Sequence, residues 1–228
     1  MSVDMLPDHV VLKKSKRARR LALRLDPVER VFHLVVPSYT SMRTVQRFAE
    51  EHEGWMTSRL MALPPRVVFE HGAVVPVFGS RRRICITVDE SFKRTQIELM
   101  HNQLRVKTNK DDPQGRIVRF LKGVAKDELL QLSKDKAKHI HKRVRGVSVR
   151  DTKSRWGSCS PDGHLSFSWR LIFAPPEAFD YVVAHEVAHL RHLDHSKAFW
   201  GVCRGLSDNF IEGQYWMREH GHELMRYG

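Results

Sequence analysis

The spacing of three histidines and a glutamate near residue 190 constrains the fold more than any other feature of the chain. The segment DYVVAHEVAHLRHLDHSKAFW begins at Asp180 and contains an HExxH motif that starts at His185. On a helix, His185 and His189 are about 40° apart around the axis and one turn apart along it, so they can share one metal ion. Glu186 is turned by about 100° from His185 and would lie beside that ion, where a carboxylate can take a proton from water.

A third ligand is predicted at His195, six residues after His189. If the helix continued, His195 would lie about 240° around the axis and roughly 9 Å further along, out of reach of the same ion. The helix must therefore end between these two histidines, and the chain must fold back. Asp194 tolerates the left-handed conformation that often ends a helix. His192 is the alternative ligand, because it lies on the same helix face as His185, but its reach is poor unless the helix bends.

Three imidazoles with a fourth coordination position open are typical of a catalytic zinc site rather than a structural one. Imidazole ligands also suit other first-row metals, so the pattern favours Zn²⁺ without excluding those. We therefore expect metal binding by His185, His189 and His195, and general-base catalysis by Glu186. The alternative is that the histidines are surface residues of an amphipathic helix, which would leave the spacing of Glu186 and His195 unexplained.

The composition indicates an ordinary globular protein with a strong positive charge. The chain has 228 residues, and its formal net charge is +13. It has no apolar run near the roughly 20 residues that a membrane span needs, and its start lacks the pattern of a signal peptide. The chain has three cysteines, Cys85, Cys159 and Cys203, an odd number that contains no CxxC pair. We therefore expect no disulfide framework and a cytoplasmic protein. From the missing apolar run, we expect no membrane partner.

The first 108 residues are predicted to be a β-rich region with one helix. Residues 10–37 suggest a β-hairpin, and residues 41–63 a helix capped by Ser41. Short strands follow, around residues 67–69, 74–78, 83–88, 96–99 and 103–107.

The predicted catalytic region covers residues 109–228, and the whole chain is expected to be α+β. Its expected elements are a helix at 113–142, a strand at 147–150, a hairpin at 154–173, a helix from Pro176 to about Leu193, a helix after Ser196 and helical structure from Tyr215.

Three basic clusters could follow a phosphate backbone: Lys13–Arg20, Arg81–Arg83 and Lys134–Arg145. Solvated faces, and lysines that protect a sheet edge, explain them equally. No aromatic residues of the kind that stack on bases are interleaved with them. Two histidine pairs, His139/His141 and His220/His222, could bind a second metal.

Residues 154–200, SRWGSCSPDGHLSFSWRLIFAPPEAFDYVVAHEVAHLRHLDHSKAFW, resemble the YgjP-like metallopeptidases, relatives of the SprT-like and WLM metalloproteases. The resemblance extends over about residues 12–222. It implies a zincin-type α+β fold with the active-site helix packed on a small β-sheet, metal binding by the three histidines and catalysis by Glu186. His164 and Ser168 depart from the residues that relatives more often have there.

The expected function is zinc-dependent hydrolysis of peptide bonds, with a peptide or protein as substrate. An extended substrate could add to the strand before the metal helix, and Trp156 to Ser158 could then border the cleft, although Trp156 could equally belong to the core. One alternative is hydrolysis of a nucleotide phosphoanhydride, although no Gly-rich phosphate loop is visible. The other is a zinc-stabilised protein that binds nucleic acid without catalysis.

Overall fold

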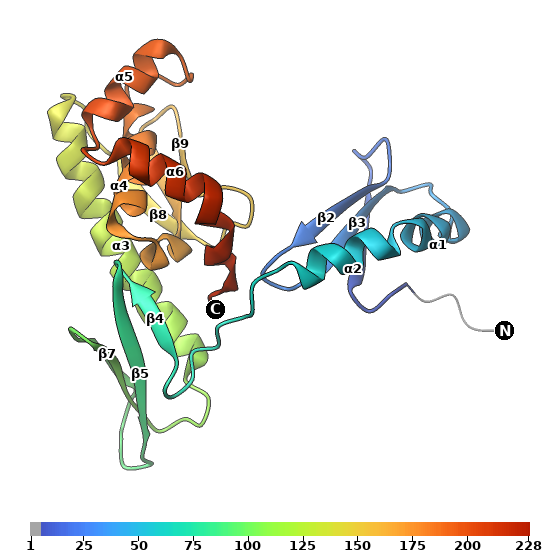
Figure 1. The fold of residues 1–228 in the computed structure, drawn as a ribbon, viewed down its shortest axis with the longest axis horizontal. Helices are drawn as coiled ribbons and strands as arrows, with labels where there is room; N and C mark the ends of the chain where they lie inside the picture. The colour runs from blue at the N-terminus through green and yellow to red at the C-terminus, as the bar shows by residue number, and fades with distance from the viewer. Residues whose placement is uncertain (1–5) are drawn as a thin grey trace. The chain divides into compact units, whose positions relative to one another are not determined.

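The computed structural model describes residues 6–228 and divides the chain into two compact units, Met1–Pro65 and Arg66–Gly228 (Figure 1). Each unit has a hydrophobic core of its own. The boundary predicted between residues 108 and 109, where the β-rich region gives way to the catalytic region, falls inside the second unit, between a β-sheet and a long helix. The mixture of helices and three small sheets agrees with the predicted α+β class.

The first unit is built on a three-stranded sheet in the order β1-β3-β2. Its strands are β1 (Val10–Ser15), β2 (Ala22–Asp26) and β3 (Val31–Pro37). Strands β2 and β3 form the expected antiparallel hairpin, while β1 pairs in parallel with β3. The Asp26 carboxylate fixes the hairpin turn, since its Oδ1 accepts hydrogen bonds from the backbone N–H groups of Val28 and Glu29.

Two helices, α1 (Met42–Glu51) and α2 (Glu53–Met61), complete the first unit in place of the single helix expected over residues 41–63. Ser41 caps α1 as expected and accepts a hydrogen bond from the Thr44 N–H. The chain leaves helical geometry at His52, whose φ and ψ are −110° and 5° and whose ring hydrogen-bonds to the Phe48 carbonyl. This local bond competes with the regular helical pattern, and helix propensity alone does not reveal it.

The second unit begins with a four-stranded sheet in the order β4-β5-β7-β6. Its strands are β4 (Val74–Val77), β5 (Ser80–Val88), β6 (Gln96–Leu99) and β7 (Gln103–Thr108). Strands β5 and β7 are parallel, and the other two pairs are antiparallel. The strand expected at residues 67–69 is reduced to one isolated bridge between Val67 and Tyr227.

The long helix α3 (Gln114–His139) connects this sheet to the second one. Figure 1 shows α3 extending from behind β4 and β5 to a position beside α4. The second sheet has the order β8-β10-β9, with β8 (Gly146–Arg150), β9 (Gly157–Cys159) and β10 (His164–Ser168). The remaining elements are the 3-10 helix η1 (Trp169–Phe173), α4 (Pro176–Ala188), α5 (Lys197–Gly205), α6 (Phe210–His220) and the 3-10 helix η2 (Gly221–Arg226).

The hairpin expected up to residue 173 ends at Ser168, and the five residues of η1 follow it. All five are buried, Arg170 among them at 1% exposure, which a strand with one solvated face does not produce. Among residues 6–228, no helix combines the length and the apolar character that crossing a bilayer requires.

The buried guanidinium of Arg170 ties the C-terminal residues to this core. Its Nη1 donates to the Asp151 carboxylate, and its Nε donates to the Tyr227 carbonyl at 3.0 Å. The Asp151 side chain is 45% exposed, and Lys122 also pairs with it. Burial acts to raise the pKa of Asp151, but the hydrogen bond and charge of Arg170, with help from Lys122, outweigh burial and lower that pKa.

We expect Asp151→Asn to lower the free energy of unfolding at pH 7 by roughly 1–3 kcal/mol, because Arg170 loses its ionised partner. A lowered folded-state pKa stabilises the fold above the unfolded-state value of about 3.9, and this contribution is lost as the pH falls through the folded value. Urea unfolding should therefore show the parent and the variant converging below about pH 4. Asp127→Asn is the control, because Asp127 is exposed and has no ion pair among the described residues. A pH-independent difference would contradict this account.

Candidate metal centre

The helix that carries the HExxH motif, α4, crosses the middle of the second core. Pro176 occupies its first turn, where proline is favoured because the missing N–H has no helical partner there. Eight of its residues are buried: Ala178, Phe179, Val182, Val183, Ala184, Glu186, Val187 and Ala188. Burial on this scale gives α4 a fixed position, which in turn fixes the direction of the side chains on its solvent-facing side.

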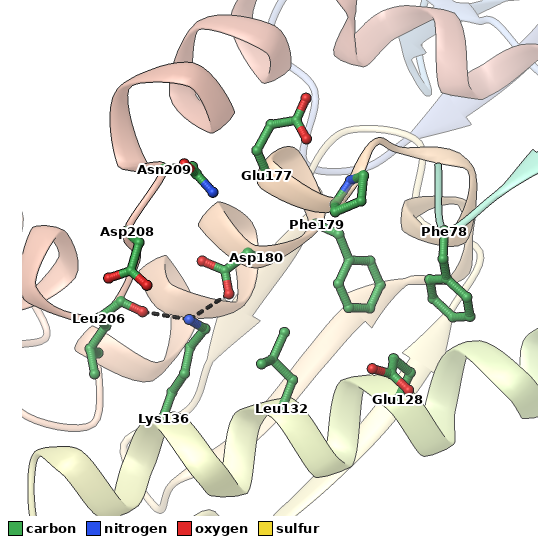
Figure 2. Close-up of a pocket in the computed structure, with 11 residues that line it drawn as sticks. Phe78, Glu128, Leu132, Lys136, Glu177, Phe179, Asp180, Leu206, Asp208 and Asn209 are labelled. Carbon is green, nitrogen blue, oxygen red and sulfur yellow. Dashed lines mark hydrogen bonds and ion pairs between the residues drawn. The ribbon is translucent and has the colours of Figure 1, made fainter. Parts of the chain in front are cut away.

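An ion pair between Lys136 and Asp180 holds α4 against α3 (Figure 2). The Lys136 Nζ lies 2.6 Å from Asp180 Oδ1 and also donates to the Leu206 carbonyl at the end of α5. Lys136 is only 8% exposed, so the pair fixes three helices relative to one another. The hollow around it, of about 520 Å³, includes none of the predicted metal ligands in its lining.

The chain folds back directly after α4. The helix ends at Ala188, and the Ala188 carbonyl accepts hydrogen bonds from the N–H groups of Arg191 and His192, at 3.0 and 3.1 Å. The left-handed conformation expected near Asp194 is wrong, because the non-glycine residues with positive φ in the described chain lie elsewhere. Asp194 instead accepts a hydrogen bond from the Ser196 N–H at 3.2 Å, just before α5 begins.

This turn brings His185, His189 and His195 together. One ring nitrogen from each lies within 4.8 Å of the other two, and Nε2 of His195 is 3.2 Å from Nε2 of His185. His192 is outside this cluster, but its backbone carbonyl lies 2.9 Å from Nδ1 of His189. Such a bond fixes the tautomer and leaves Nε2 of His189 with its lone pair free. Of residues 6–228, the pairs His139/His141 and His220/His222 belong to no cluster of three.

The ring of Phe199 packs against all three histidine rings. Its side chain is fully buried, and its ring centroid lies 5.0, 4.5 and 4.8 Å from those of His185, His189 and His195. It lies in the first turn of α5, where its N–H donates to the capping hydroxyl of Ser196. The turn after α4 and the Ser196 cap therefore position both His195 and the Phe199 ring that packs against the histidines.

The electrostatics of the cluster favour the neutral forms of two of its histidines, His185 and His189. Burial, followed by the charges of His189 and His195, lowers the pKa of His185 to about 4. Burial also lowers the pKa of His189. Neutral imidazoles keep the lone pairs that bind a metal, and three of them form a donor set that zinc and other first-row ions accept. The residues present therefore fit a metal ion.

Glu186 lies beside the histidines and is 6% exposed. Burial raises its pKa to about 8, with the charge of Arg155 acting in the opposite direction. Strand β9 packs against α4 here, and a Cβ on Gly157 would lie 2.4 Å from Oε1 of Glu186 and 2.5 Å from its Cγ. Only glycine leaves room for the carboxyl group at this point.

A cavity of about 320 Å³ opens next to Glu186 and His185. Trp156 and Gly157 line it, so Trp156 both packs against the core and borders the cavity. Sequence reasoning missed the other wall residues, which are Tyr181, Val182, Gln214, Met217 and Arg218. Tyr181 precedes His185 by one turn and could have been found from that spacing. No sequence signal placed α6 beside α4, where Gly213 allows its backbone to approach the Glu177 carbonyl.

An α+β unit in which three histidines could hold a metal ion beside a buried carboxyl group is the arrangement that many metal-dependent enzymes use. The comparison with protein families gives the particular family: the chain belongs to the YgjP-like family, whose model, described as a YgjP-like metallopeptidase domain, matches residues 19–220. The chain thus carries a metallopeptidase-type hydrolase domain, and the resemblance drawn from its motifs is confirmed. No curated protein and no solved structure matches it.

We expect His195→Ala to weaken zinc binding by at least about 100-fold, since losing a hydrogen-bonding partner of a ligand already costs roughly 10–100-fold. His192→Ala is the matched control, because it removes an imidazole three residues away but keeps the backbone carbonyl that contacts His189. Isothermal titration of the metal-free proteins with Zn²⁺ measures both affinities. Equal losses in the two variants would contradict the assignment of His195.

We expect Gly157→Ala to lower casein hydrolysis at least about tenfold while zinc content stays at the parent level, because the new Cβ displaces the Glu186 carboxyl group. Overpacking of this kind also costs about 1–3 kcal/mol of stability. Gly123→Ala is the control, since no atom lies within 4 Å of the position of its added Cβ. Parent-like rates in a folded Gly157→Ala protein would show that the contact does not matter.

Proposed function

We propose that the chain is a zinc-dependent peptidase in which His185, His189 and His195 bind the metal and Glu186 is the general base. The observation that carries the proposal is the meeting of three histidine rings next to a buried glutamate, at the edge of a cavity. A zinc ion bound there would polarise a carbonyl group and make water acidic enough to lose a proton near neutral pH.

The position of Glu186 supports its proposed role as the general base. Glu186 follows His185 directly on α4, so its carboxyl group is turned to the side of the histidine cluster, into the wall of the cavity. Burial raises the pKa of Glu186 to about 8, but a metal ion held by the neighbouring histidines would favour the ionised form. That carboxylate could take the proton from the attacking water and deliver it to the nitrogen of the departing amine. Gly157 limits the positions that the carboxyl group can adopt.

The strand β9 supports a peptide as the substrate. It lies at the edge of its sheet and pairs with β10 on one side. Two backbone hydrogen bonds show which residues turn their N–H and C=O groups toward β10. The Ser168 N–H donates to the Trp156 carbonyl, and the Ser160 N–H donates to the His164 carbonyl. By the alternation of an antiparallel ladder, the backbone groups of Gly157 and Cys159 point to the free edge. An extended substrate could pair there by strand addition.

The cavity next to Glu186 would receive a substrate side chain close to the scissile bond. Trp156, Tyr181, Val182 and Met217 give it a largely apolar wall. Arg218 is the single arginine in the lining, which contains no lysine. Its charge is paired with Glu219, since its Nε lies 2.7 Å from Glu219 Oε1. The cavity therefore suits a peptide side chain better than the triphosphate of a nucleotide, whose hydrolysis is the alternative reaction.

We expect Glu186→Gln to lower the rate of casein cleavage by about 10²–10⁴-fold, because general acid–base catalysis contributes that much. The affinity for Zn²⁺ should stay within a few-fold of the parent value, since Glu186 does not belong to the cluster of ligands that could hold the metal. Mass spectrometry of the released peptides and titration with Zn²⁺ give the two measurements.

The matched control is Glu177→Gln, which makes the same change in the first turn of the same helix, away from the histidines. It should cleave at the parent rate. Equal activity of Glu186→Gln and the parent would remove Glu186 from the mechanism. Absence of cleavage by the zinc-loaded parent would favour the non-enzymatic reading, in which zinc stabilises a protein that binds nucleic acid.

A further inference from the structure

A cationic hollow lies in the second unit, away from the histidine cluster. It has a volume of about 650 Å³ and lies between the β5–β6 connection, the end of β7 and the first turns of α3. Five of its lining residues are cationic: Lys93, Arg94, Lys110, Arg116 and Arg119. No acidic residue is in the lining. The five cations come from three separate segments, none of them in the basic clusters that the sequence suggested.

None of these five side chains has a carboxylate partner among the residues that the structure describes. The carboxylates of residues 6–228 that form ion pairs form them with side chains outside the hollow, such as those of Lys122, Lys138, Arg105 and Arg145. The two acidic residues just before α3, Asp111 and Asp112, are not in the lining, and the Asp112 carboxylate accepts a hydrogen bond from the Gln114 N–H rather than pairing with one of the five cations. Five like charges gathered without a counter-ion repel one another, so the arrangement favours an anionic ligand.

The hollow is also held in shape by the fold. Thr95 and Thr108 join its two β segments by a hydrogen bond of 2.7 Å between their hydroxyl groups, and Thr108 is fully buried. Arg116 and Arg119 are three residues apart, so they share one face of α3. They lie in its first two turns, where the partial positive charge of the helix adds to theirs. Phe120, Ile97 and Asn109 supply an apolar and amide wall.

We infer that this hollow binds consecutive phosphate groups, as a nucleic-acid backbone or a free polyphosphate carries them. Phosphate oxygens satisfy several arginine and lysine donors at once, and arginine forms paired hydrogen bonds with them. A ligand with one carboxylate would leave most of the five charges unpaired. The net charge of +13 for the whole chain would steer such a polyanion toward the surface.

Fluorescence anisotropy of the full chain with a labelled single-stranded 20-mer, measured over a series of salt concentrations, tests the inference. The double variant Arg116→Ala/Arg119→Ala should bind at least about tenfold more weakly, and its salt slope should fall by about 1.4, because each phosphate contact to a single strand contributes about 0.7. Circular dichroism and thermal unfolding confirm that the variant is folded.

Lys126→Ala/Lys134→Ala is the matched control, because it removes two exposed, unpaired cations from the same helix outside the hollow. It should change the affinity less than about twofold. Equal losses in both double variants, unchanged binding of Arg116→Ala/Arg119→Ala, or no binding by the parent would each overturn the inference.

Competition identifies the source of the phosphates. Displacement of the 20-mer by inorganic tripolyphosphate at similar concentrations would indicate a compact polyphosphate, whereas displacement only by unlabelled oligonucleotide would indicate a nucleic-acid backbone. Competition by poly-glutamate as strong as that by oligonucleotide would overturn the assignment to phosphate, because charge alone would then explain binding.

Discussion

The turn after Ala188 decides whether the three histidine rings can meet. A helix that continued past His189 would carry His195 to the far side and about 9 Å further along the axis. The structure avoids this outcome through one backbone carbonyl, that of Ala188, which accepts two N–H groups and closes the helix. The His192 carbonyl then contacts the His189 ring, so the same short turn positions a ring and sets its tautomer. Phe199, in the first turn of the helix that follows, takes its place from this geometry.

The buried surroundings of α4 make that turn effective. Because most of the helix is enclosed by apolar residues and tied to α3 by Lys136 and Asp180, the histidines cannot adjust by moving the helix. The same burial lowers the pKa values of His185 and His189 and so favours their neutral forms. A fixed helix and neutral rings are both needed before a metal ion can bind with little cost of reorganisation.

Much of the fold and the histidine cluster could be predicted, because their signals are local. Helix periodicity gave the position of α3, and the i, i+4 spacing placed His185 and His189 on one face. The need for a helix end before His195 followed from geometry alone. The conformation that ends the helix did not follow from geometry. A left-handed residue was expected, whereas the chain uses an ordinary right-handed turn and an aspartate side chain. Several local conformations can meet the same requirement.

The features that escaped prediction depend on contacts between distant segments. The buried Arg170, for example, needs partners at Asp151 and Tyr227, which are 19 and 57 residues away along the chain. The split of one expected helix at His52 is the exception, because it depends on a local ring bond to Phe48 that helix propensity does not reveal. The α6 wall of the cavity and the five cations of the cationic hollow come from segments that no periodicity connects. Composition can show that lysine and arginine are abundant, but only the packing of β6, β7 and α3 brings these five together.

The separation of the two hydrophobic cores has a consequence for cooperativity. Residues such as Phe32 and Met56 stabilise the first unit, and none of them belongs to the core that surrounds α4. Heat denaturation of this chain therefore has two calorimetric transitions available to it rather than one all-or-none event. Since a ligand stabilises only the part of a protein that binds it, a metal ion bound by the histidines would raise the temperature of one transition and leave the other as an internal reference.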